Sequence, residues 1–345
     1  MEARGEGAGR GDGRLMRLSS DSLTARIGEI VHRREFIASV AASAPLALAC
    51  DRQARRAPGG LKLSVTCDMF QGSERRLPVD TIDRTDPRPD PDVKYTPDEG
   101  LALAKSLGYD GFEMFDWRDD RERSAYADAM RKHGLEAVCI TANKGVQAPG
   151  CSLTDPDERE GFLREIADAS SVAAEFACQR LVVLTGPERE GVSRAEQMDS
   201  CVAGLKEAVP ILEQAGTTIV VEPINTLVTR PGFFLAGARE GFEMLRQVDS
   251  HRVKLLFDIY HVQVTDGDLI LQIRNNIDLI GHFQIGDHPG RMQPGTGEIN
   301  HRNVFRAIYE LQEAGKFDGY AGLEYHPSVP LPQTMAEVRQ LSTFS

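Results

Sequence analysis

From residue 61 onward, short β-branched runs alternate with longer amphipathic segments, and this alternation constrains the fold more than any other feature of the chain. Strands that alternate with helices are typical of a parallel sheet with helical crossovers. The pattern predicts eight strands, at residues 62–67, 111–115, 135–141, 180–184, 217–222, 253–258, 279–285 and 319–324. The chain is therefore expected to have an α/β fold.

Helices are predicted between the strands, because apolar residues recur there at intervals of three and four positions. Examples are residues 97–107, 158–176, 194–215 and 303–314. Several predicted helices are followed by glycine, which readily takes the left-handed conformation at a helix end. These glycines are Gly108, Gly134, Gly216 and Gly315.

Eight such units could close into a barrel or remain an open sheet. The chain has no G-x-G-x-x-G motif after its first strand and no P-loop, so the common nucleotide-binding motifs are missing. Polar residues stand at the C-terminal ends of strands five to eight, where barrel enzymes carry their chemistry. We therefore predict a single-domain (β/α)8 TIM barrel over residues 58–345, since such a barrel needs about 250 residues.

A long polar segment, residues 71–95, follows the first predicted strand and contains the run DPRPDPD. Loops of this length are uncommon in compact domains, and they are usually either functional or disordered. The segment is interpreted either as a lid over the barrel mouth or as a disordered insertion.

The first 57 residues are predicted to be an export leader and linker. Arg33 and Arg34 precede an apolar stretch, residues 36–49, which is too short to span a bilayer and ends in Ala47-Leu48-Ala49-Cys50. This order is typical of a twin-arginine (Tat) signal with cleavage before Cys50, which would send the protein to the periplasm. Lipidation of Cys50, giving a membrane-anchored lipoprotein, is one alternative, and a frayed amphipathic N-terminal helix is another.

Charge and cysteine content exclude several kinds of partner. The 40 Lys and Arg against 52 Asp and Glu give a net charge of -12, which should repel nucleic-acid phosphates. Of the six cysteines, Cys67 and Cys139 lie in apolar runs typical of strands, and Cys178 and Cys201 lie in helical patterns. Buried free thiols are therefore favoured over disulfides, and the lack of a C-x-x-C pair argues against a zinc knuckle.

Four predicted strands in succession end in a side chain that carries oxygen. These side chains are Glu222, Asp258, Gln284 and Glu324, and strand ends of a barrel meet at its mouth. Three converging carboxylates repel one another unless a metal ion or bound protons compensate their charge. An all-oxygen ligand set favours one hard divalent ion, and we expect Mn²⁺ or Mg²⁺.

Several motifs occur in an order and spacing that resemble a known family. They are VEPIN at 221–225, PGFFL at 231–235, DIYH at 258–261, HFQI at 282–285 with PGR at 289–291, GEIN at 297–300 and LEY at 323–325. The chain resembles hydroxypyruvate isomerase, a member of the xylose isomerase-like barrel superfamily, over about residues 61 to 327. That superfamily also holds tagatose 3-epimerase-type enzymes and endonuclease IV.

The resemblance implies a role for each matching residue. It makes Glu222, Asp258, Gln284 and Glu324 the metal ligands, and it makes Glu222 and Glu324 the pair that moves the proton. His261 and Arg291 match positions that hold substrate oxygens. The implied reaction is isomerisation of a hydroxy-keto acid or keto-sugar through an enediolate. For His261 the alternative is a core histidine that is hydrogen-bonded to a backbone carbonyl.

Three competing functions remain open from the sequence. A keto-sugar 3-epimerase would use the same metal and both glutamates, and a sugar-binding barrel without turnover would keep only the fold. A phosphodiesterase acting on abasic DNA would need more histidines and a basic cleft, and neither is evident. The expected partner is a small sugar or keto acid, and the export leader makes a larger extracellular sugar or keto-sugar acid plausible. The sequence gives no number of subunits, so an oligomer remains open.

Overall fold

The computed structural model describes residues 59–71, 93–143 and 150–344, and every structural statement below concerns these residues. Contacts divide the chain into residues 1–55 and residues 56–345. Only the second unit contains described residues, so the predicted export leader lies outside them. None of the described helices is long and apolar enough to cross a membrane.

Eight parallel strands close into a barrel in chain order, from β2 to β9, with β9 pairing back onto β2. The strands are β2 (Leu63–Thr66), β3 (Gly111–Met114), β4 (Glu136–Thr141), β5 (Arg180–Val183), β6 (Thr218–Val221), β7 (Val253–Asp258), β8 (Ile280–Ile285) and β9 (Ala321–Leu323). The predicted fold and all eight predicted strands are confirmed, with boundaries that differ by at most two residues.

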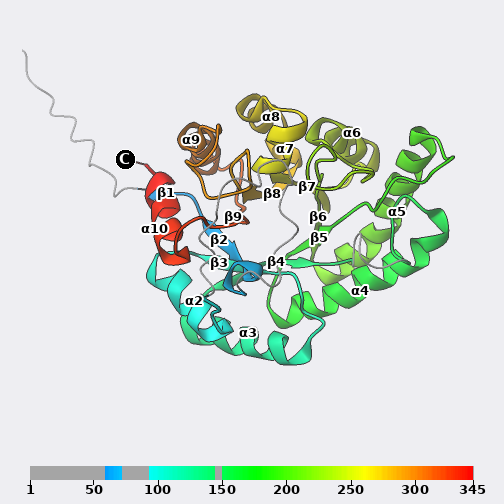
Figure 1. Cartoon of the computed structure of the whole chain (residues 1–345). Coiled ribbons are helices and arrows are strands. Elements are labelled where there is room, and N and C mark those ends of the chain that lie inside the picture. The colour runs from blue at the N-terminus through cyan, green and yellow to red at the C-terminus, as the bar shows by residue number, and fades with distance from the viewer. Residues whose placement is uncertain (1–58, 72–92, 144–149, 345) are drawn as a thin grey trace, which may run out of the picture. The chain divides into compact units, whose positions relative to one another are not determined.

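Helices surround the barrel, as Figure 1 shows. They are α2 (Pro97–Ser106), α3 (Asp120–His133), α4 (Arg159–Glu175), α5 (Arg194–Ala215), α6 (Ala238–Val248), α7 (Ile259–Thr265), α8 (Leu269–Asn276), α9 (His301–Glu313) and α10 (Leu331–Leu341). Two short strands, β1 (Gly59–Gly60) and β10 (Thr343–Phe344), pair antiparallel and bring the ends of the barrel unit together.

Local sequence signals explain where the helices begin and end. Thr96 and Ser193 each form a capping box with the glutamate three positions later, at the start of α2 and α5. Gly134 and Gly216 cap α3 and α5 with positive φ angles of 63° and 70°. The predicted glycine ends of these two helices are confirmed.

The apolar core lies in two places. Most of it fills the space between the barrel and the helices, and a smaller cluster that includes Val182, Val220 and Leu256 comes from four of the barrel strands. Five cysteines are buried and free: Cys67, Cys139, Cys151, Cys178 and Cys201. The prediction of buried free thiols is confirmed for these positions, whereas Cys50 lies outside the described residues.

The described residues at the two ends of the long segment after β2 contact each other. The backbone N–H of Tyr95 donates to the carbonyl oxygen of Phe70 at 2.8 Å, and the two rings meet edge to face with centroids 6.2 Å apart. Residues 72–92 lie outside the described residues, so the choice between a lid and an insertion stays open.

Candidate active site

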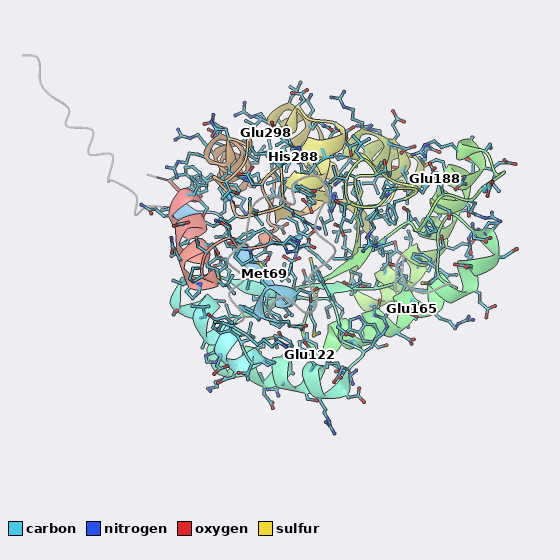
Figure 2. All side chains as sticks on the ribbon, in the orientation of Figure 1. Met69, Glu122, Glu165, Glu188, His288 and Glu298 are labelled. Carbon is cyan, nitrogen blue, oxygen red and sulfur yellow. The ribbon has the colours of Figure 1, made fainter. Side chains whose placement is uncertain are left out.

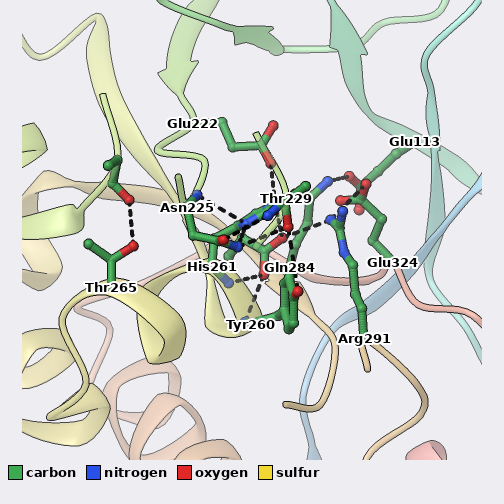
Figure 3. Close-up of polar contacts among 12 residues, drawn as sticks. Glu113, Glu222, Asn225, Thr229, Tyr260, His261, Thr265, Gln284, Arg291 and Glu324 are labelled. Carbon is green, nitrogen blue, oxygen red and sulfur yellow. Dashed lines mark hydrogen bonds and ion pairs between the residues drawn. The ribbon is translucent and has the colours of Figure 1, made fainter. Parts of the chain in front are cut away.

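The four oxygen-bearing residues lie on the neighbouring strands β6, β7, β8 and β9. Asp258 is the last residue of β7 and pairs in register with Gln284 on β8. Glu222 and Glu324 directly follow β6 and β9, and their backbone N–H groups still donate to Val183 and Ile285 in the ladder. Because the strands are parallel, all four residues lie at the same end of the barrel. Figure 3 labels Glu222, Gln284 and Glu324 there.

Arg291 links two of the three carboxylates. One guanidinium nitrogen lies 3.0 Å from Asp258 Oδ2 and 3.0 Å from Glu324 Oε1. The guanidinium also lies over the ring of Tyr260, 5.3 Å from its centroid. Arg291 therefore stands between Asp258 and Glu324, where its charge offsets part of theirs.

The loop that carries Arg291 is organised by Asp287, a buried residue that the sequence analysis did not single out. Its carboxylate accepts hydrogen bonds from the backbone N–H groups of His288, Gly295, Gly297 and Ile299. Burial alone would raise the pKa of Asp287, but the nearby His301 ring, 3.7 Å away, and the N–H groups of Gly295 and Gly297 lower it below its ordinary value. A short acid that binds several backbone groups fixes a loop in one conformation.

Asp258 has two separate tasks, one for each carboxylate oxygen. Oδ1 accepts from the backbone N–H groups of Tyr260 and His261 and so caps α7. Oδ2 faces Arg291 at 3.0 Å and His261 Nε2 at 3.6 Å. The cap fixes the side chain and leaves Oδ2 directed toward the other site residues.

His261 is held as a neutral hydrogen-bond donor. Its Nδ1 accepts from the backbone N–H of Asn225 at 3.3 Å and lies 2.7 Å from the Asn225 side-chain nitrogen, so the ring proton sits on Nε2. That nitrogen lies 3.9 Å from Glu222 Oε1. Burial lowers the pKa of His261 well below its ordinary value, and the charges of Arg291 and Arg230 lower it further. The ring meets a backbone N–H, not the backbone carbonyl of the alternative interpretation.

The carboxyl groups of the site resist ionisation. Burial raises the pKa of Glu222 well above its ordinary value, and the nearby charges of Glu324 and Asp258 raise it further. Burial also raises the pKa of Glu324 to about 8, although Arg291 opposes the shift. The pKa of Asp258 is raised by burial too, against the same arginine. Such perturbed carboxyls in one cleft are typical of functional sites.

The donor atoms fit a hard divalent ion. An oxygen of Glu222 and an oxygen of Asp258 lie within 4.8 Å of each other, in a close group that also includes a nitrogen of His261. Because the His261 ring carries its proton on Nε2, the two oxygens are the donor atoms of this group. Among the residues that the structure describes, Gln284 Oε1 and Glu324 Oε2 are buried and have no hydrogen-bond partner. Buried oxygens without partners carry a desolvation cost that a cation would remove. Glu324 is not in the close group, because Arg291 stands between it and Asp258.

A second polar cluster lies beside Gln284 inside the barrel. Glu113, on β3, is fully buried and contacts Ser64, His282 and Gln284. The sequence carried a signal for this residue that the analysis did not use, namely a charged residue inside an apolar strand. Its partners lie 49 to 171 positions away along the chain, so only the closed barrel reveals them.

The segments that follow the strands frame the mouth. Figure 2 labels Met69, Glu188 and His288, which lie on the segments after β2, β5 and β8. Figure 3 shows Glu222, His261, Arg291 and Glu324 grouped together, with Glu113 beside Glu324. The fold and the site together define a TIM barrel with a cluster of buried carboxyl, imidazole and guanidinium groups at its mouth.

A model of the xylose isomerase-like TIM barrel family matches residues 101–342, and the chain belongs to this family. Hydroxypyruvate isomerase of Escherichia coli K12 is 32% identical over 230 residues, which are 65% of this chain and 85% of the relative. The 2-oxo-tetronate isomerase of Cupriavidus necator is 31% identical over 224 residues, 63% of this chain and 84% of the relative. The chain is accordingly an isomerase-type enzyme.

Solved structures agree on the fold. The AP endonuclease, family 2, from Brucella melitensis superposes with a TM-score of 0.63 at 27% identity, covering 69% of this chain and 91% of that one. The D-allulose 3-epimerase from Methylomonas sp. superposes with a TM-score of 0.59 at 18% identity, covering 82% and 91%. At that identity the second likeness concerns the fold alone.

Proposed function

We propose that the chain is a metal-dependent isomerase that acts on a hydroxy-keto acid or a keto-sugar by proton transfer through an enediolate. The observation that carries the proposal is the position of two carboxyls, Glu222 and Glu324, after strands β6 and β9 with β7 and β8 between them. A substrate bound between them would meet one carboxyl on each side. The isomerases of E. coli and C. necator that resemble the chain support this reaction class.

In this mechanism, Glu222 and Glu324 form the acid–base pair. One carboxylate removes the proton from the carbon next to the carbonyl, and the electron pair of the broken C–H bond passes to the carbonyl oxygen. The second carboxyl then delivers a proton to the former carbonyl carbon, while the hydroxyl proton on the neighbouring carbon passes to the former carbonyl oxygen, so that the new carbonyl forms and isomerisation is complete. His261 donates a hydrogen bond from its Nε2–H group to a substrate oxygen. Arg291 balances the negative charge that develops on the substrate.

The proposed metal ligands are Glu222, Asp258, Gln284 and Glu324, and the proposed ion is Mn²⁺ or Mg²⁺. A divalent ion held there would supply positive charge that stabilises the enediolate oxygens and the ionised carboxylates. The raised pKa values of the three acids support this proposal, since burial disfavours their ionised forms and Arg291 opposes that effect only in part.

The alternative within the same site is a keto-sugar 3-epimerase, in which the proton returns to the same carbon from the opposite side. Exchange in heavy water separates the candidates. We expect the purified full chain with Mn²⁺ to introduce deuterium from solvent into hydroxypyruvate or 2-oxo-tetronate, with formation of the isomeric product in the proton NMR spectrum. Exchange with inversion of a ketose such as D-allulose would establish the epimerase. No exchange into any of the three with either ion would refute both reactions, leaving a sugar-binding barrel without turnover.

We also propose that residues 1–57 direct export by the twin-arginine route to the periplasm. The support is the order of Arg33-Arg34, the apolar stretch 36–49 and Ala47-Leu48-Ala49. Replacing both arginines by lysine should retain the full-length precursor inside the cell. Labelling of the unmodified protein, but not of Cys50→Ser, by a radioactive fatty acid would establish a lipid anchor. Processing and export unchanged in the double-lysine variant would contradict the twin-arginine route.

A further inference from the structure

The mechanism proposed above gives no task to Glu113, although this carboxyl is completely buried in the barrel. Its Oε2 accepts a hydrogen bond from Gln284 Nε2 at 3.0 Å. Its Oε1 accepts from Ser64 Oγ at 2.8 Å and lies 2.9 Å from His282 Nε2. Glu113 therefore touches a proposed metal ligand without being one itself.

The contact with Gln284 sets the direction of an amide group. An amide nitrogen can only donate, so the nitrogen end of Gln284 faces Glu113 and the oxygen end faces away from it. That oxygen, Oε1, is buried and has no hydrogen-bond partner among the described residues. It is therefore available to a ligand on the side opposite Glu113.

The two ends of a glutamine amide have nearly the same size, but only the oxygen binds a hard cation. Packing alone cannot choose between the two orientations. The reversed orientation would set the Gln284 oxygen against the oxygen Glu113 Oε2 and would remove the N–H group that now donates to it. A carboxylate at this position makes the reversed orientation unfavourable.

The barrel gives Glu113 little freedom to move. A Cβ atom at position 322 would lie 1.6 Å from Glu113 Oε1 and 3.0 Å from Ser64 Oγ, so Gly322 leaves the space that the carboxyl occupies. Ser64 and His282 hold Oε1 from two other strands. The carboxylate therefore has a fixed position from which to orient Gln284.

We propose that Glu113 is a positioning residue, which orients the Gln284 amide so that its oxygen faces the metal site. The proposal rests on the proposed function, because it assumes that Gln284 is a ligand. Groups that orient a ligand in this way typically change metal affinity by about 10- to 100-fold when they are replaced.

The test swaps the side chains of Glu113 and Gln284 by substitution. Glu113→Gln removes the orienting charge and keeps the size, and it should weaken Mn²⁺ binding by about 10-fold or more. The double variant Glu113→Gln with Gln284→Glu reverses donor and acceptor in the same contact, and a carboxylate at 284 presents an oxygen in either orientation. We expect the double variant to recover Mn²⁺ affinity to within about 3-fold of the unmodified protein.

Ser64→Ala is the matched control, because it removes a hydrogen bond to Glu113 Oε1 and leaves the Gln284 contact in place. We expect its Mn²⁺ affinity to stay within about 3-fold of the unmodified protein, below the change of about 10- to 100-fold that replacing an orienting group causes. Affinity is measured on the full chain by electron paramagnetic resonance of free Mn²⁺ after chelation and dialysis. Urea unfolding of the chelated proteins separates a change in affinity from a change in stability.

The outcomes are distinct. Equal Mn²⁺ affinity in Glu113→Gln and the unmodified protein overturns the proposal and leaves the proposed function standing. A double variant that binds no more tightly than Glu113→Gln also overturns it. If Glu113→Gln does not fold, Glu113→Asp takes its place, because the shorter side chain withdraws the acceptor from the Gln284 amide, and an Mn²⁺ affinity equal to that of the unmodified protein again overturns the proposal. An unmodified protein that binds neither Mn²⁺ nor Mg²⁺ refutes the proposed function itself, and the inference with it.

Discussion

Glu222 and Glu324 occupy surroundings in which a carboxyl group keeps its proton more readily than in water, since burial raises both pKa values. Groups of this kind exchange protons with a bound substrate near neutral pH. Replacing either residue by glutamine keeps its shape and removes its acid–base function. We expect Glu222→Gln and Glu324→Gln each to reduce the rate of solvent deuterium exchange by at least about 100-fold.

The control for this prediction is Glu160→Gln, because Glu160 pairs with Arg164 on the outer surface of α4. Its exchange rate should equal that of the unmodified protein. If both site variants introduce solvent deuterium into the substrate at the rate of the unmodified protein, Glu222 and Glu324 are not the acid–base pair.

The raised pKa of Glu324 also predicts how the stability of the metal-free protein depends on pH. Its ordinary pKa of 4.5 rises to about 8 in the folded state, so the folded protein binds more protons than the unfolded chain between these values. The contribution of Glu324 to the free energy of unfolding therefore falls as pH rises from about 4.5 to about 8, and its magnitude is on the order of a few kcal/mol.

Urea unfolding of the chelated protein at pH 5, 6.5 and 8 measures this dependence. Glu324→Gln cannot ionise and should lose less stability than the unmodified protein over the interval. An equal or steeper loss in Glu324→Gln would show that Glu324 is ionised in the folded metal-free protein.

Residue by residue, part of the site could be predicted from the sequence. Asp258 and Glu324 were recognisable because each ends an apolar run, and a strand end has a defined position in a barrel. The bridge from Arg291 to both of these acids was not predictable, because it depends on a loop conformation that Asp287 sets through the backbone. Asn225 belongs to a motif that was identified, but its contact with the His261 ring required the fold.

At the level of elements, the loop between β8 and α9 controls Arg291. The two carboxylate oxygens of Asp287 accept hydrogen bonds from four backbone N–H groups in this loop. An asparagine side chain has only one oxygen that can accept them. Asp287→Asn should lower the free energy of unfolding by about 1–3 kcal/mol, since buried N–H groups lose their acceptor. The rate at which the variant introduces solvent deuterium into the substrate should fall as well, because the same loop positions Arg291.

Glu298→Gln is the control in the same loop, because Glu298 is exposed and accepts a hydrogen bond from the Gln263 amide. Chemical denaturation and the exchange assay should both give values close to those of the unmodified protein. An Asp287→Asn variant as stable and active as this control would show that the loop does not depend on Asp287.

The elements themselves were largely predictable, because their boundaries follow local rules. The α5 helix begins after Ser193 with its capping box and ends at Gly216 in the left-handed conformation. Strand bounds were less sharp, and β9 is three residues long where six were predicted. Its ends depend on pairing with β2 and β8, which come from other parts of the sequence.

At the scale of the whole barrel, closure creates the site. Glu113 and Gln284 are 171 positions apart and hydrogen-bond inside the barrel, and Glu222 and Glu324 reach the same mouth from opposite ends of a four-strand series. The site holds three carboxyls with raised pKa values and one buried arginine. An added positive charge would stabilise the ionised forms of these carboxyls. The central claim is that a divalent ion supplies it.

Anomalous X-ray diffraction from crystals of the full chain soaked in Mn²⁺ tests that claim most directly. We predict one strong peak at the barrel mouth, with oxygens of Glu222, Asp258, Gln284 and Glu324 at about 2.0–2.4 Å, the range for hard divalent ions. A peak at the other group of close donor atoms, Glu113, Cys139 and His282, or no peak in the barrel at all, would contradict the account.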